Sequence, residues 1–222
     1  MLPTTDKLTV AGGLSVRAAR RLVRAVLLAA FCLAAGLALT RVVRERGLAA
    51  ELPRLGRIPA FRMVNQDGQT VGDLELRGRP FIADFFYASC TTSCPRLTAE
   101  MLGLYRAFSA PETPVHLVSI TLDPVNDTPQ ALNTYAQRLG VAAQRWSFLS
   151  GRDADLNRVV GDGFKLYFER PDDNAGVSTI MHGEWLVLVD ASGEIRGYYQ
   201  ISDDEHMADL PRDARALAGE SR

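Results

Sequence analysis

Short apolar runs and helically spaced apolar residues alternate along the middle of the chain. Residues 81–87 and 115–122 are almost wholly apolar over the length of a strand, which is typical of central strands buried on both faces. Between them, residues 95–108 place leucine, methionine and phenylalanine at helical spacing. Residues 128–140 open with threonine and proline, an N-cap and a first-position proline for a further helix. The pattern therefore predicts a strand–helix–strand–helix unit.

The segments around this unit predict shorter strands and helices. In chain order they are a strand pair at 61–76 turned at 65–68, a strand at 146–149, a helix from Asp153, a further strand at 164–169, a hairpin of 185–190 and 194–200, and a helix at 203–218. Elements in this order predict an α/β fold in which a mixed central sheet carries helices on both faces.

A long apolar run near the amino terminus predicts a helix that spans a membrane. Residues 25–40 hold no charge, and flanking apolar residues extend the stretch to 22–43, which as a helix spans about 33 Å. Four arginines lie within residues 17–24, so the positive-inside rule places the amino terminus in the cytoplasm. A cleaved signal peptide is the alternative, because small residues near 36–38 fit a cleavage site. Both interpretations export the chain beyond about residue 45.

Charge divides the chain near the same place. In the first 50 residues seven arginines and Lys7 outweigh Asp6 and Glu45, whereas the remainder carries 17 basic and 24 acidic residues. An acidic main domain disfavours nucleic acid as a partner, because phosphate binding needs a basic face. We therefore expect four parts in order: a basic cytoplasmic tail at 1–21, an anchor at 22–43, a linker at 44–60 and a domain at 61–222.

Two cysteines stand where a central strand turns into a helix. Three residues separate Cys90 from Cys94, which places the two sulfurs about one helical turn apart. The helix N-terminus favours the thiolate, the form that binds metal and attacks disulfides. The spacing permits either a disulfide or two ligands to one metal, and it does not choose between redox exchange and metal binding. A purely structural disulfide would close a very small loop and contribute little stability.

A third metal ligand would come from a histidine. His116 starts a strand and His206 lies among acids at the start of the last helix, so both have ordinary structural explanations. His182 lies in a turn just before the strand at 185–190, beside the sheet end that carries the cysteines, and Gly183 permits close backbone approach. Two thiolates and one imidazole form a soft three-coordinate set that suits copper.

Three segments resemble the Sco/SenC family, copper-binding proteins of thioredoxin fold involved in assembling cytochrome c oxidase. They are FFYASCTTSCP (85–95), SITLDPVNDTP (119–129) and MHGEWLVLVDASGEIRGYY (181–199), in family order, and the resemblance covers roughly residues 55–218. It implies a thioredoxin-like fold in which Cys90, Cys94 and His182 correspond to the copper ligands. The insert at 91–93 and the pair after His182 depart from the usual family residues, which could alter copper affinity or the partner surface.

Two acidic residues are expected close behind the ligands. Asp84 lies six positions before Cys90, where thioredoxins carry a buried acid, so we expect either a raised pKa or a carboxylate satisfied by a local hydrogen bond. Asp123 is the second of these residues. Together with Asp127 it is expected to cap the turn and the helix that follow the strand at 115–122.

The resemblance implies a metallochaperone rather than an enzyme with substrate turnover. By this hypothesis a single span holds the protein in a bacterial inner membrane, and the periplasmic domain binds one copper ion, Cu(I) or Cu(II). It delivers copper to the dinuclear copper site of cytochrome c oxidase, with that copper-bearing subunit and a thiol reductant as partners. The alternative is a thiol–disulfide oxidoreductase of the exported compartment, in which Cys90 and Cys94 form a disulfide in one half of the cycle and keep partner cysteines reduced.

Overall fold

The computed structural model describes residues 16–90, 94–109, 114–169 and 181–220. The chain divides into two units between Arg44 and Glu45. The first unit is built on α1 (Val16–Glu51), a single helix that continues past the boundary. Within α1, Val23–Arg41 is 19 residues long with a mean hydropathy of 2.1, and it is long and apolar enough to cross a membrane.

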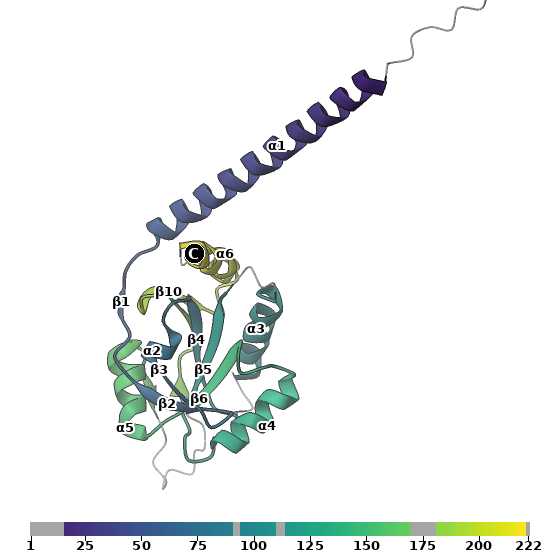
Figure 1. Ribbon diagram of the computed structural model, residues 1–222. Helices are drawn as coiled ribbons and strands as arrows, with labels where there is room; N and C mark the ends of the chain where they lie inside the picture. The colour runs from purple at the N-terminus through teal and green to yellow at the C-terminus, as the bar shows by residue number, and fades with distance from the viewer. Residues whose placement is uncertain (1–15, 91–93, 110–113, 170–180, 221–222) are drawn as a thin grey trace, which may run out of the picture. The chain divides into compact units, whose positions relative to one another are not determined.

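The second unit is built on an eight-stranded sheet with the order β1-β10-β9-β4-β5-β6-β2-β3 (Figure 1). The strands are β1 (Gly56–Arg57), β2 (Arg62–Asn65), β3 (Thr70–Gly72), β4 (Phe81–Phe86), β5 (His116–Thr121), β6 (Trp146–Ser150), β9 (Trp185–Val189) and β10 (Glu194–Gln200). A separate pair joins β7 (Phe168–Glu169) to β8 (Met181–His182). The helices are α2 (Asp73–Leu76), α3 (Cys94–Ala107), α4 (Pro129–Leu139), α5 (Asp153–Leu156), the π-helical η1 (Asn157–Gly163) and α6 (Asp204–Glu220).

Three parallel strands form the centre of the sheet. β4 pairs with β5, and β5 with β6, in parallel, while β9 and β2 flank them in antiparallel orientation. Every residue of β4 and β5 is buried, as expected of strands covered on both faces. We call the edge where β4, β5 and β6 begin the amino end of the sheet, and the edge where they finish the carboxyl end.

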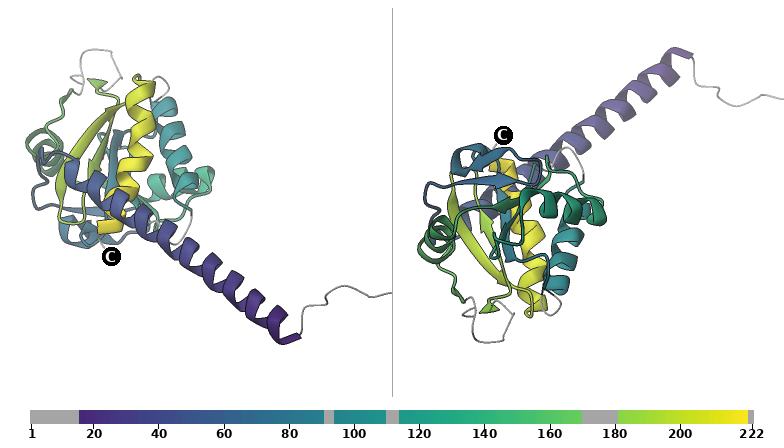
Figure 2. Two further views of the ribbon diagram at one scale, coloured as in Figure 1. Left: turned by 90° about the horizontal axis from the view of Figure 1, so that it is seen from above. Right: turned by 90° about the horizontal axis from the view of Figure 1, so that it is seen from below.

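Helices cover both faces of this sheet. The Phe86 ring meets Tyr135 of α4 at 5.5 Å between centroids, whereas Phe85, its neighbour on the opposite face, meets Phe164 after η1 at 5.0 Å. Figure 2 shows α3 and α6 together on one side and the α5–η1 helix on the other. The predicted mixed sheet with helices on both faces is confirmed, and with it the α/β class.

Two local predictions differ from the structure. Residues 73–76 turn into α2 rather than continuing the second strand, because the Glu75 carboxylate accepts a hydrogen bond from the Gly72 amide and closes a helical turn. Of the strand expected at 164–169, only β7 forms. Helix α1 extends to Glu51, well into the segment expected to be a linker, and β1 lies within the same segment.

Candidate metal centre

The cysteine pair lies at the carboxyl end of the sheet, between β4 and α3. Cys90 is half-buried in the loop after β4, and Cys94 is the first residue of α3 and only 2% exposed. Both are present as thiols. The Cys94 amide donates a hydrogen bond to Cys90 Sγ at 3.4 Å, so the sulfur of one cysteine lies over the helix start that carries the other. Residues 91–93 lie outside the described part of the chain.

A buried carboxylate holds the loop that carries Cys90. Asp127 Oδ2 accepts hydrogen bonds from the Ala88 amide, at 2.9 Å, and from the Thr121 hydroxyl at the end of β5. The side chain is 2% exposed, and burial raises its pKa. The sequence predicted a turn and helix cap here and missed the tether to the cysteine loop, since no spacing rule signals a contact between residues 39 apart. Asp127 therefore fixes where the chain leaves β4, two residues before Cys90.

The remaining acid of the same turn has the expected local role. Asp123 accepts hydrogen bonds from the Asn126 amide, at 3.3 Å, and from the Asn126 side-chain nitrogen, at 2.8 Å. These bonds close the turn that leads into α4. The helix itself begins as predicted, with the Thr128 hydroxyl accepting from the Ala131 amide. A role for Asp123 close behind the metal ligands stays a prediction.

Asp84 lies inside the sheet on the strand that leads to the cysteines. It is 1% exposed, accepts a hydrogen bond from the Ser119 hydroxyl, and through Ser119 is linked to the Trp146 indole NH, which donates at 2.8 Å. Burial raises the pKa of Asp84 to about 7, while the Ser119 bond acts in the opposite direction. Both sequence-based alternatives therefore hold together: the acid is locally satisfied and its pKa is raised.

The electrostatics at Cys94 differ from the expectation for a helix N-terminus. Burial, the hydrogen bond with the Cys90 thiol and the negative charge of Asp84 all raise the pKa of Cys94 above its ordinary value, with burial the largest cause. In the metal-free pair, loss of water therefore outweighs the helix dipole and keeps Cys94 protonated. A bound cation would reverse this balance, because metal ligation stabilises the thiolate directly.

Topology brings the backbone of His182 to the same end of the sheet. β9 runs antiparallel to β4 with Val187 opposite Ala83, so the chain before Trp185 lies at the carboxyl end. There β8 pairs His182 with Phe168. The side chain of His182 lies outside the described part of the structure, and its role as a ligand stays a prediction.

The other two histidines have the structural roles that the sequence suggested. His116 is 2% exposed at the amino end of the sheet, its Nε2 lies 2.9 Å from the Ser147 hydroxyl, and burial lowers its pKa to about 3. His206 is exposed in the first turn of α6, with its ring 4.8 Å from that of Tyr199. Among the side chains that the structure describes, no group of three metal-binding residues forms.

A close approach explains the glycine that follows His182. A Cβ atom built on Gly183 would lie 2.6 Å from Cδ1 of the Trp185 indole, so the ring occupies the space that a larger residue would need. The sequence predicted that something approaches the backbone here, and the structure identifies it as Trp185. Gly183 thus sets how the chain bends between β8 and β9.

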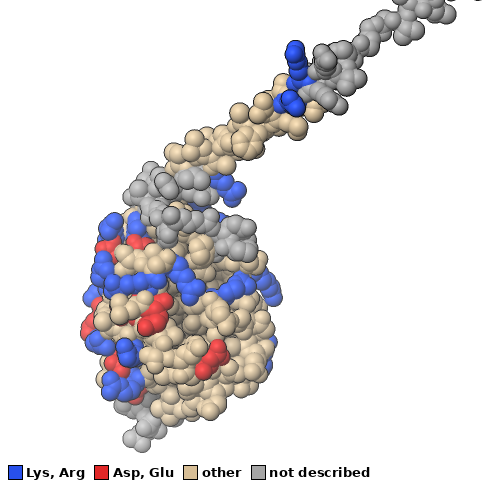
Figure 3. All heavy atoms as spheres, in the orientation of Figure 1, with Lys and Arg blue, Asp and Glu red and all other residues tan. Residues whose placement is uncertain are grey.

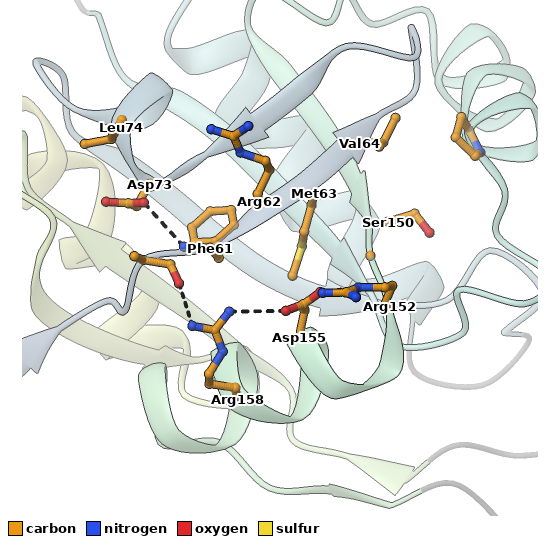
Figure 4. Close-up of a pocket in the computed structure, with 13 residues that line it drawn as sticks. Phe61, Arg62, Met63, Val64, Asp73, Leu74, Ser150, Arg152, Asp155 and Arg158 are labelled. Carbon is orange, nitrogen blue, oxygen red and sulfur yellow. Dashed lines mark hydrogen bonds and ion pairs between the residues drawn. The ribbon is translucent and has the colours of Figure 1, made fainter.

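A cavity of about 770 Å³ lies elsewhere, beside β2 and the start of α5 (Figure 4). Neither cysteine lines it. Its buried surface includes Phe61 and Met63, and the guanidinium groups of Arg152 and Arg158 both bind the Asp155 carboxylate. The arginine charges are therefore partly offset, and the cavity is separate from the cysteine pair.

The donor chemistry of the pair fits a soft metal ion. Cys90 and Cys94 offer two sulfurs at the carboxyl end of the sheet, and β8 brings the backbone of His182 to that end. Sulfur and imidazole ligands select copper and zinc over hard cations such as magnesium or calcium. The pair can also carry out thiol–disulfide exchange, because both groups are thiols within one loop-to-helix turn.

Known proteins resemble the second unit over most of its length. The SCO1 protein homolog of Bacillus subtilis (strain 168) is 27% identical over 162 residues, which are 72% of this chain and 82% of that protein. A Stutzerimonas stutzeri protein named as a candidate copper-binding protein is 32% identical over 176 residues, covering 78% of this chain and 84% of its own.

Solved structures share the fold. The crystal structure of a SCO1/SenC family lipoprotein from Bacillus anthracis has a TM-score of 0.68 at 27% identity, covering 76% of this chain and 98% of that one. Bradyrhizobium japonicum ScoI with copper bound has a TM-score of 0.60 at 26% identity, covering 71% and 99%. BsSco, a member of the Sco family of cytochrome c oxidase assembly proteins with a disulfide switch, has a TM-score of 0.64 at 25% identity, covering 75% and 96%.

These matches assign the family and the fold. Nearly all of each solved chain aligns with about three quarters of this one, so the fold of the second unit forms alone in those crystals. The thioredoxin-like fold expected from the resemblance is confirmed. The profile of the SCO1/SenC family matches residues 52–212, and the chain belongs to that family.

Proposed function

We propose that this protein is a membrane-tethered copper carrier that hands copper to the dinuclear copper site of cytochrome c oxidase during assembly of the oxidase. The observation that carries the proposal is a pair of thiols, half-buried Cys90 and buried Cys94, at the carboxyl end of the sheet in a chain of the SCO1/SenC family. Two relatives support the metal and the process: one is ScoI with copper bound, and the other is described as a member of a cytochrome c oxidase assembly family.

One copper ion, Cu(I) or Cu(II), is held by Cys90, Cys94 and His182. Both thiols must release protons to bind it, so copper uptake strengthens as pH rises. Cys90 is the more exposed sulfur, and Cys94 lies deeper at the start of α3. We therefore expect an incoming ligand of the oxidase subunit to reach the metal on the Cys90 side and to displace that thiolate first.

The protein is held in a bacterial inner membrane by the apolar segment of α1, with the domain in the periplasm. Val23–Arg41 supplies the span, and the basic tail at 1–21 remains in the cytoplasm by the positive-inside rule. The parts proposed are the tail, the anchor at 22–43, the linker at 44–60 and the copper-binding domain at 61–222.

Thiol–disulfide exchange is the second candidate function. The hydrogen bond from the Cys94 amide to Cys90 Sγ favours this function, because the bond places the two cysteines within one turn of the chain. In this reaction the pair loses two electrons and two protons and forms a disulfide, while a disulfide of the partner takes them up and becomes a dithiol. A thiol reductant must then regenerate the pair. Both functions need the reduced state, since only thiolates bind copper.

A comparison of two rates separates these functions. In both arms the reduced domain is mixed with a soluble copper-site fragment of the oxidase subunit. In the first arm the domain carries copper, and the rate of copper transfer to the fragment is measured. In the second arm the domain is metal-free and the fragment is oxidised, and the rate of disulfide reduction is measured. The carrier function predicts fast copper transfer, lost in Cys90→Ala and in His182→Ala. If disulfide reduction is fast and His182→Ala leaves both rates unchanged, the oxidoreductase is the main function and the carrier proposal fails.

A further inference from the structure

The amino end of the sheet carries an excess of arginine. Strand topology places there the residues that precede β4 and β6, the strand β1, the start of β10, the last turns of α3 and α4, and the part of α6 from Asp209 onward. The arginines of these segments are Arg54, Arg57, Arg77, Arg79, Arg106, Arg138, Arg145, Arg196, Arg212 and Arg215. Figure 3 shows basic side chains in a band across the upper half of the domain, where β1 and the end of α6 lie in Figure 1.

Acids at this amino end are fewer, and two of those in the described segments are buried. The acids of this end are Glu75, Asp190, Glu194, Asp209, Asp213 and Glu220, whereas Asp73 lines the cavity beside Arg62 and Arg152. Asp190 is 9% exposed and is paired with Arg196 at 3.0 Å, while Asp213 is 5% exposed and is paired with Arg212 at 3.1 Å. Each buried acid therefore offsets one arginine of this end, and the remaining arginines outnumber the remaining acids.

The carboxyl end has the opposite charge. Among the described residues, its acids include Asp73, Asp123, Asp127, Asp153, Asp155, Glu184, Asp203, Asp204 and Glu205, and its basic residues include Arg62, Arg96, Arg152 and Arg158. The second unit is thus acidic around the cysteine pair and basic at the far end of the sheet, although the unit as a whole is acidic.

Helix dipoles explain only part of this separation. Arg106 and Arg138 lie in the last turns of α3 and α4, where a cation stabilises the helix. Arg54 and Arg57, however, lie on the extended segment before the domain, and Arg79 lies in the loop before β4. Arg54 is 71% and Arg57 52% exposed, and they share a single carboxylate, Glu194. These exposed guanidinium groups exceed what local structure requires.

The chain from the apolar helix enters the domain at this same end. Arg196, 4% exposed, donates to the backbone oxygens of Leu52 at 2.8 Å and Pro53 at 3.0 Å, and the Leu55 amide donates to Ile195. Helix α1 ends at Glu51, ten residues beyond the end of the apolar segment at Arg41. At 1.5 Å per residue, those ten residues span about 15 Å. Only a short stretch of chain therefore separates the apolar segment from the first residues that the domain binds, Leu52 and Pro53.

We propose that the arginine-rich amino end of the sheet is a contact surface for anionic lipid headgroups. The proposal rests on the proposed anchoring of α1 in a membrane. A basic group near an anionic bilayer is attracted over about a Debye length, 8–10 Å, and the attraction weakens with salt. Contact at this end turns the carboxyl end, with its acidic rim and cysteine pair, away from the lipid. The metal site is then open to a partner protein rather than to the bilayer.

Binding of the isolated domain to vesicles tests this proposal. A fragment of residues 45–222, which lacks the apolar segment and corresponds to a fold that forms alone in related crystals, is sedimented with vesicles of phosphatidylglycerol and phosphatidylcholine. Two double variants are compared. The amino-end variant combines Arg54→Gln and Arg106→Gln, and the carboxyl-end variant combines Arg62→Gln and Arg152→Gln. Each removes two exposed positive charges. Circular dichroism and copper stoichiometry are measured for every protein.

The expected result is binding to phosphatidylglycerol that is absent with pure phosphatidylcholine and weakens with salt. The amino-end variant should bind about thirtyfold more weakly, at about 1 kcal/mol per arginine, and the carboxyl-end variant should match the unaltered fragment. Equal loss in the two variants, or no preference of the unaltered fragment for the anionic lipid, overturns the proposal. Copper stoichiometry reports separately on the metal site, so failure of the lipid surface leaves the proposed function intact.

Discussion

At the scale of single residues, buried carboxyl groups organise the cysteine site. Cys90, Cys94 and Asp84 could be singled out from the sequence, because spacing and an apolar strand identify them. Asp127 could be recognised only as a cap. Its tether to Ala88 joins two strand ends, and such a contact exists only once β4 and β5 have paired.

Removal of the Asp127 tether should loosen the metal site. Asp127→Ala leaves the Ala88 amide and the Thr121 hydroxyl without their acceptor, which costs about 1–3 kcal/mol of folding free energy. Because the Cys90 loop is then less fixed, Cu(I) affinity should fall by about tenfold, the equivalent of 1.4 kcal/mol. Competition with a chelator of known affinity measures it.

Asp127→Asn is the matched control, because its amide oxygen can accept the same two bonds. It should restore most of the copper affinity as well as the stability. Unchanged affinity in Asp127→Ala, with stability reduced, would show that the residue supports the fold alone and not the site.

The raised pKa of Asp84 predicts a specific dependence of stability on pH. The unfolded chain releases this proton near pH 4, whereas the folded protein keeps it until about pH 7. Between these values the folded state binds more protons, so the contribution of Asp84 to stability is present below pH 4 and is lost as pH rises through 7. Asp84→Asn, which keeps an acceptor for Ser119, removes this dependence.

Urea unfolding at pH 4.5 and pH 7.5 measures the effect. Between pH 4.5 and pH 7.5 the unaltered domain should lose the stability that protonated Asp84 contributes, and Asp84→Asn should not. The change in the free energy of unfolding between the two pH values should therefore differ between the proteins by about 4 kcal/mol at most, in favour of Asp84→Asn at the higher pH. Parallel changes in the two proteins would contradict the assigned pKa. The comparison is made on the metal-free, reduced domain, so copper does not contribute.

At the scale of elements, long patterns were predicted well and short ones poorly. The strands β4 and β5 and the helices α3 and α4 match the expected segments to within a few residues, because each is long enough to show its period. Segments 73–76 and 164–169 were too short for periodicity to distinguish a strand from a helix, and local hydrogen bonds determine their secondary structure. The segment before Phe61 was expected to be a spacer, since nothing in the sequence shows that Arg196 binds its backbone.

Arg196 should be the residue that holds this entering segment to the sheet. Arg196→Ala would leave Asp190 buried without its ion-pair partner and remove both bonds to Leu52 and Pro53, so we expect a loss of about 3–5 kcal/mol. Chemical unfolding measures the loss, and limited proteolysis near residues 52–57 should become faster. Arg54→Ala, which removes an exposed pair, is the control and should cost about 1 kcal/mol or less. Equal stability of the two variants would show that the segment is held by other contacts.

At the scale of the whole molecule, the second unit has two unlike ends. The chain enters at the basic end, through Leu52 and Pro53, and the cysteines lie at the acidic end. The sequence revealed the total charges and the split between the first 50 residues and the remainder, but not the division within the domain. That division depends on which loops the parallel strands bring together, and it appears only with the topology.

The X-ray absorption spectrum of copper bound to residue variants tests the central claim most directly. For the unaltered domain carrying one copper per chain, we predict two sulfur scatterers and one imidazole in the first coordination shell. His182→Ala should lose the imidazole signal and keep both sulfurs, whereas Cys90→Ala should lose one sulfur. An imidazole signal that persists unchanged in His182→Ala, or a sulfur count that does not fall in Cys90→Ala, would contradict the proposed copper site.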